Sequence, residues 1–88
     1  MRALGAVALA AVLAGCGGHS APRGRAIFHR SCAGCHTLTG HETDAPGGDL
    51  RVGRLSVDAV ASFARVMPVD PPLGKAEARA VATYVVSR

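Results

Sequence analysis

The sequence has few aromatic side chains from which to build a core. It has no tryptophan, and its aromatic residues are Phe28, Phe63 and Tyr84. Hydrophobic residues make up 49% of the 88 positions, but many of them are alanines, which bury little surface. Domains shorter than about 70–80 residues usually need a disulfide, a metal or a cofactor to be stable. We therefore expect one small domain that depends on such a group.

The chain also lacks an apolar run of the roughly 20 residues that a membrane-spanning helix needs. Arg2 precedes a shorter uncharged run that ends in Leu13-Ala14-Gly15-Cys16, as in an export signal. These four residues resemble the lipobox of bacterial lipoproteins, and the resemblance implies cleavage before Cys16 and acylation of that cysteine. An ordinary secretory signal with an incidental cysteine is the alternative. We expect residues 1–15 to be the signal peptide and 16–22 a flexible tether.

Basic clusters are absent as well. The net charge is +4, yet the Lys and Arg residues are scattered and no aromatic residues are interleaved with them. Nucleic-acid binding surfaces usually concentrate positive charge on one face. The sequence therefore predicts no nucleic-acid partner.

The most informative stretch is Cys32-Ala33-Gly34-Cys35-His36. The C-x-x-C-H pattern is typical of covalent haem c attachment, because two thiols at this spacing reach one edge of a porphyrin and the histidine then reaches the iron. A thioredoxin-like redox pair would need a βαβ setting, and a zinc site would need a second ligand pair. Neither is visible in the sequence. With Cys16 acylated and Cys32 and Cys35 in thioethers, no odd thiol is left.

Three helices are predicted in this all-α domain, residues 23–88. The first runs from about Arg23 into the haem motif, with Gly24, Ile27 and Phe28 on one face. Glycines and a proline make residues 37–53 a loop. A second helix begins after the N-cap Ser56 and ends near Val66, before Pro68, and a third runs from about Lys75 to Ser87.

The stretch from Gly24 to His36 resembles the N-terminal helix and haem motif of class I c-type cytochromes. In that family the N- and C-terminal helices cross at a glycine with an aromatic residue over it, and Gly24 and Tyr84 match these positions. The resemblance covers about residues 23–88. It implies a small fold of three helices wrapped around one covalent haem.

The family also implies the remaining ligands. Met67, in a proline-rich loop before the last helix, matches the methionine that ligates the iron opposite His36, with His41 or a purely packing methionine as alternatives. Pro46 matches the residue whose carbonyl accepts a hydrogen bond from the ligating histidine. Arg51 and Arg54 are candidates to neutralise the haem propionates, or are simply solvated.

The resemblance implies an electron carrier that changes no substrate bond and is therefore not an enzyme. We expect it outside the cytoplasm, periplasmic and anchored by acylated Cys16, exchanging single electrons with redox proteins such as a quinol-oxidising complex or a terminal oxidase. Two other functions stay open. The chain could be the haem subunit of a larger oxidoreductase, or a five-coordinate haem sensor or peroxidase.

Overall fold

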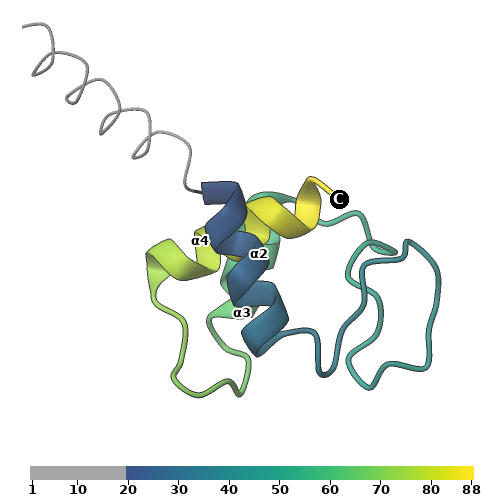
Figure 1. Cartoon of the computed structure of the whole chain (residues 1–88). Coiled ribbons are helices and arrows are strands. Elements are labelled where there is room, and N and C mark those ends of the chain that lie inside the picture. Colours follow the sequence, from purple (N-terminus) through teal and green to yellow (C-terminus); the bar gives the residue numbers. More distant parts are fainter. Residues whose placement is uncertain (1–19) are drawn as a thin grey trace, which may run out of the picture.

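Helices provide all the regular secondary structure in the part of the chain that the computed structural model describes, residues 20–88. They are α2 (Ser20–Ser31), α3 (Val57–Ala64) and α4 (Lys75–Val86) (Figure 1). Within this range there is no strand, and only one isolated bridge joins Thr37 to Asp49. The prediction of an all-α domain is therefore confirmed. The expected signal peptide and Cys16 lie outside the described residues.

The helix α2 begins at Ser20, three residues before the expected start at Arg23. Pro22 is tolerated there because the first N–H groups of a helix have no partner within the helix. The end of the expected tether is therefore helical. The helix ends at Ser31, and Cys32 to Cys35 continue it as a turn.

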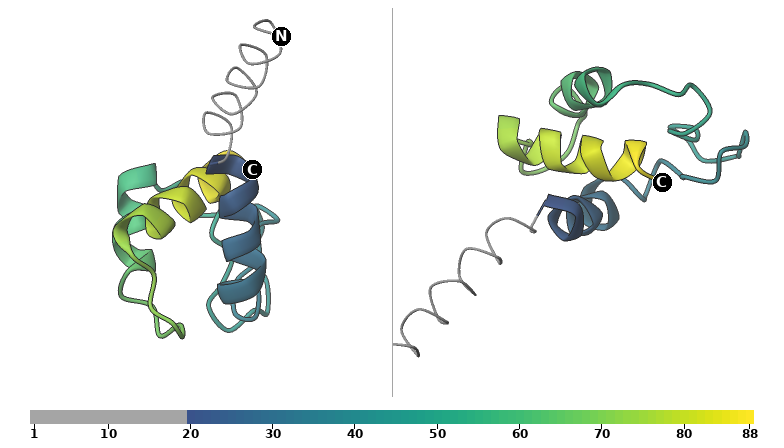
Figure 2. Two further views of the ribbon diagram at one scale, coloured as in Figure 1. Left: turned by 60° about the vertical axis from the view of Figure 1, so that its left-hand side comes forward. Right: turned by 90° about the horizontal axis from the view of Figure 1, so that it is seen from above.

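The helix α4 lies between α2 on one side and α3 on the other (Figure 2). Its contact with α2 is closest at Gly24, where an added Cβ would collide with the Ala80 carbonyl and lie 2.8 Å from Tyr84 Cβ. The Tyr84 ring also packs on Phe28, with ring centroids 5.9 Å apart. The structure thus brings Gly24 and Tyr84 together at the crossing, as the sequence predicts.

Replacing Gly24 by alanine is expected to destabilise the folded protein by about 1–3 kcal/mol, because the methyl group must push the α4 backbone away. Chemical denaturation of the purified protein measures this loss. Gly53→Ala is the control, since its added Cβ would make only an ordinary 3.8 Å contact with Leu55. Equal stability of the two variants would mean that the helices tolerate a wider crossing.

The ends of α3 and α4 are fixed by local hydrogen bonds. The Ser56 hydroxyl accepts from the Ala59 N–H at 3.1 Å, as expected of an N-cap. Gly74 offers no side chain, but the Glu77 carboxylate accepts from its N–H at 3.3 Å. The helix α3 ends at Ala64, slightly before the expected Val66.

The core is small and lies mainly along α4. Six of its ten buried hydrophobic residues belong to this helix, and three of those six are alanines. The full set is Ile27, Phe28, Val60, Leu73, Ala78, Ala80, Val81, Ala82, Tyr84 and Val85. The helix α3 contributes only Val60 as a fully buried side chain, and it covers α4 loosely.

Candidate haem-binding site

The C-x-x-C-H residues form the turn that follows α2. The Cys32 N–H donates to the Phe28 carbonyl at 2.8 Å, and the His36 N–H donates back to the Cys32 carbonyl at 3.0 Å. This turn leaves Cys32 half-buried and Cys35 exposed, both as free thiols. The two sulfur atoms and the imidazole are therefore held on one short, hydrogen-bonded segment.

Burial raises the pKa of the Cys32 thiol above its ordinary value, against the opposing influence of the Arg30 guanidinium. A redox-active C-x-x-C pair instead needs a cysteine whose pKa is lowered, because the thiolate is the nucleophile. Cys32 therefore lacks the lowered pKa of an activated thiol.

The loop that follows His36 holds its imidazole on the Nδ1 side. Its Nδ1 lies 3.3 Å from the Gly48 carbonyl oxygen, to which it donates in the Nδ1–H tautomer. Gly47 packs against the ring so closely that an added Cβ would lie 2.7 Å from Nδ1. The Gly47 N–H also donates to the Cys35 carbonyl at 2.6 Å. These contacts leave Nε2 as the nitrogen available for a ligand.

The acceptor for His36 differs from the one expected. Pro46 was the candidate, whereas the structure uses the carbonyl of Gly48, two residues later. Pro46 instead lines a second cavity on the Cys35 side of the motif. The physical reason is the turn at Gly48, whose backbone has a φ of 78° and whose N–H donates to the Ala45 carbonyl at 2.9 Å.

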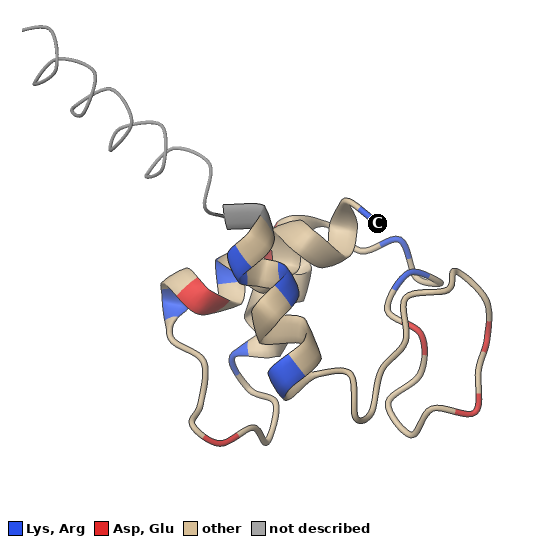
Figure 3. Cartoon of the chain, viewed as in Figure 1, with Lys and Arg blue, Asp and Glu red and all other residues tan. Residues whose placement is uncertain are grey.

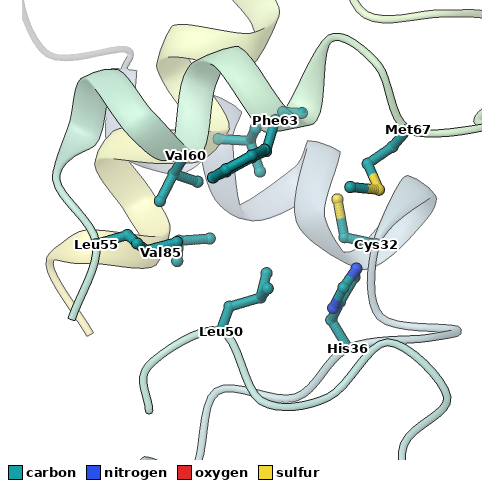
Figure 4. A pocket seen from close by; sticks show the side chains of 10 residues that line it. Cys32, His36, Leu50, Leu55, Val60, Phe63, Met67 and Val85 are labelled. Atoms are coloured by element: carbon teal, nitrogen blue, oxygen red, sulfur yellow. The ribbon is translucent and has the colours of Figure 1, made fainter. Parts of the chain in front are cut away.

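A small apolar cavity of about 70 Å³, partly open to solvent, lies beside His36. Figure 4 shows Met67, Cys32 and His36 at the same end of it, with Cys32 between the other two. Met67 reaches this position from the loop after α3, where the Val69 N–H donates to the Met67 carbonyl at 2.8 Å. The residues lining the cavity are Cys32, His36, Leu50, Leu55, Val60, Phe63, Ala64, Met67, Val81 and Val85.

Three large apolar side chains that line this cavity are poorly covered by the rest of the protein. Leu55, Phe63 and Met67 are 41%, 53% and 39% exposed. An apolar group bound there would cover their exposed parts, which contributes about half of the 1.5–3 kcal/mol that full burial of such a side chain gives. An imidazole and a thioether also suit a haem iron. The chemistry of these side chains therefore fits a haem.

Arg51 and Arg54 line a further cavity, which shares Leu50, Leu55 and Val85 with the first. Arg54 has a φ of 51°, a left-handed conformation that is uncommon outside glycine and often marks a functional segment. The two arginines therefore lie in a cavity that adjoins the apolar one through these three shared residues. Carboxylates of a bound molecule would meet positive charge there.

Asp49 organises the loop and was missed by sequence reasoning. Its carboxylate accepts hydrogen bonds from Thr37, Thr39, Gly40 and Arg51. Partial desolvation opposes ionisation, but these hydrogen bonds outweigh it and hold the pKa of Asp49 well below its usual range. The available signal was an aspartate after two glycines, since Asp often accepts from a backbone N–H two residues later.

The other histidines within residues 20–88 lie away from the cavity. His41 is exposed in the loop, where its N–H donates to the Thr39 hydroxyl at 3.1 Å. His29 is exposed on α2, with its ring edge-on to Phe28. Met67, rather than His41, is thus the potential ligand that lines the same cavity as His36.

Comparison with protein-family models, with curated proteins and with solved structures finds no match to this chain. Among residues 20–88, no three His, Cys, Asp or Glu side chains gather as a metal-ion site. The same part of the chain contains no helix long and apolar enough to cross a membrane. The functional argument therefore rests on the geometry of the chain itself.

Proposed function

We propose that this chain is a monohaem class I cytochrome c that carries single electrons. The observation that carries the proposal is the apolar cavity that His36 of the C-x-x-C-H motif and Met67 line together, with Cys32 between them (Figure 4). This set of side chains suits an apolar prosthetic group that is held by cysteines and ligated by an imidazole and a thioether.

Each residue of the site would have a distinct task. Cys32 and Cys35 would attach the haem through two thioether bonds, and His36 Nε2 and Met67 Sδ would ligate its iron. The haem supplies one-electron cycling of its iron between the ferric and ferrous states. The Gly48 carbonyl holds the His36 ring by accepting from Nδ1, and the apolar lining excludes water.

Two protein ligands would leave the iron no open position for a substrate. This ligand set favours an electron carrier over a sensor or a peroxidase, because both of the latter need five-coordinate iron. A methionine ligand also raises the reduction potential compared with two nitrogen ligands. Cys35 is exposed, so electrons would pass at this edge during brief contacts with a donor and an acceptor, such as a quinol-oxidising complex or a terminal oxidase.

The direct test is to produce the whole chain in a bacterium that attaches haem c and to purify the product. One haem per chain, resistant to denaturing extraction, is the expected result. Oxidised protein should also show the weak long-wavelength absorption band that methionine ligation gives in this family. A product without covalent haem would overturn the proposal. Co-purification from solubilised membranes would distinguish a free carrier from a subunit of a larger oxidoreductase.

Membrane attachment through Cys16 is also part of the proposal. The change Cys16→Ser is expected to release an otherwise normal, haem-loaded protein from the membrane, because two acyl chains anchor stably where one does not. Fractionation followed by absorbance of the soluble fraction measures the release. A variant that stays in the membrane after detergent-free washes would mean that an uncleaved signal or a partner holds it.

A further inference from the structure

The carboxylate of Asp49 is the centre of the loop behind His36. Oδ2 accepts from the hydroxyls of Thr37 and Thr39, both at 2.8 Å, and from the Thr39 N–H at 2.5 Å. Oδ1 accepts from the N–H groups of Gly40 and Arg51, at 3.0 and 2.9 Å. One side chain therefore ties the segment just after His36 to the segment that returns beside it.

This returning segment carries the carbonyl that His36 uses. The Thr37 N–H donates to the Gly48 carbonyl at 3.3 Å, and the Leu50 N–H donates to the Thr37 carbonyl at 2.9 Å. The Gly48 carbonyl, which also faces His36 Nδ1, is thus fixed by backbone bonds on both sides of Asp49. The Asp49 carboxylate binds the chain on both sides of these backbone bonds, so we expect its loss to loosen the position of this carbonyl.

The partner of a ligating imidazole influences the metal as well as the ring. A carbonyl that accepts from Nδ1–H fixes the tautomer and orientation and makes Nε2 a stronger donor to the metal. A stronger donor favours the ferric iron, so a well-held Gly48 carbonyl lowers the reduction potential. A Gly48 carbonyl that is poorly held allows the reduction potential to rise.

We propose that Asp49 is a positioning residue that sets the orientation and basicity of His36 through the Gly48 carbonyl. The proposal rests on the proposed function, because it assigns His36 to an iron. Asp49 itself ligates nothing. Its carboxylate organises the loop so that the carbonyl meets Nδ1.

The chain offers a matched control for the charge of Asp49. Glu42, Asp44 and Asp49 are the acidic residues of the loop before Arg51 (Figure 3). Asp44 is exposed, and no described residue forms a hydrogen bond with its side chain. Asp44→Asn therefore removes one negative charge from the same loop while leaving the hydrogen bonds of Asp49 intact.

The experiment compares the midpoint potentials of the haem-loaded wild type, Asp49→Asn and Asp44→Asn at neutral pH. Both variants lose a negative charge, which alone raises the potential slightly. We expect Asp49→Asn to give the clearly larger upward shift and also to speed hydrogen exchange of the His36 Nδ1 proton, followed by NMR. Equal potential shifts and unchanged exchange would overturn the proposal.

Thr39→Val is a second variant, which keeps the net charge and removes one donor to Asp49. It is expected to shift the potential in the same direction by less, with faster exchange of the Nδ1 proton. If Asp49→Asn cannot be purified, Thr39→Val alone tests the positioning role of Asp49. An unchanged midpoint potential and an unchanged exchange rate of the Nδ1 proton in this variant would contradict the proposal. Wild-type protein without haem would instead refute the proposed function, so the two failures are distinguishable.

Discussion

Replacing Met67 by alanine is expected to lower the midpoint potential by tens to hundreds of millivolts, within the roughly 0.8 V that axial ligation spans. The thioether favours ferrous iron, and alanine leaves either water or an open position on that face. The variant should therefore also bind carbon monoxide and gain some peroxidase activity. Potentiometric titration and carbon monoxide difference spectra measure both effects. Met67→His should lower the potential too, but its second nitrogen ligand should keep carbon monoxide out.

His41→Ala is the control for this series. His41 is exposed in the loop and does not line the cavity, so its removal should change neither potential nor spectrum. The ligand assignment would be wrong if His41→Ala shifted both while Met67→Ala shifted neither. A wild type that binds carbon monoxide readily would indicate open iron, and hence a sensor or an enzyme.

Changing Cys32 and Cys35 together to alanine is expected to leave the chain largely unfolded. Leu55, Phe63 and Met67 are 41%, 53% and 39% exposed, so a haem that covers them would contribute about 2–4 kcal/mol by burial. That is a large share of the whole stability of a small domain, about 5–15 kcal/mol. Circular dichroism and proteolysis of the double variant measure the loss.

Cys16→Ser is the matched control, because it removes a cysteine that is not part of the C-x-x-C-H motif. It should keep both its haem and its helical content. If the double cysteine variant instead melts cooperatively from a helical state, the alanine and valine contacts of α4 are stronger than their small buried surface suggests.

The helices could be predicted from the sequence because their signals are local. The Ser56 cap, the break at Pro68 and the apolar faces of α2 and α4 each depend on a few neighbouring residues. The close crossing at Gly24 was implied by the family resemblance, and the structure shows it. The start of α2 was misplaced because a proline permits a helix start at several nearby positions.

The loop behind His36 could not be predicted to the same detail. Every residue carries a carbonyl, so composition does not identify which one meets Nδ1. The choice of Gly48 over Pro46 depends on backbone angles that Gly48 adopts and on the hydrogen bonds of Asp49. The bonds that Thr37, Thr39 and Gly40 donate to Asp49 join residues about ten positions apart, and no periodic pattern in the sequence predicts them.

The crossing at Gly24 has a consequence for the entropy of folding. Gly24 and Ala80 are 56 positions apart, so their contact closes a loop that costs about 3–4 kcal/mol by the (3/2)RT ln n rule. An iron joining His36 to Met67 would shorten the free chain within that loop to 25 positions, a saving of only about 0.7 kcal/mol. A link between His36 and Met67 would therefore ease the closure of this one crossing only slightly.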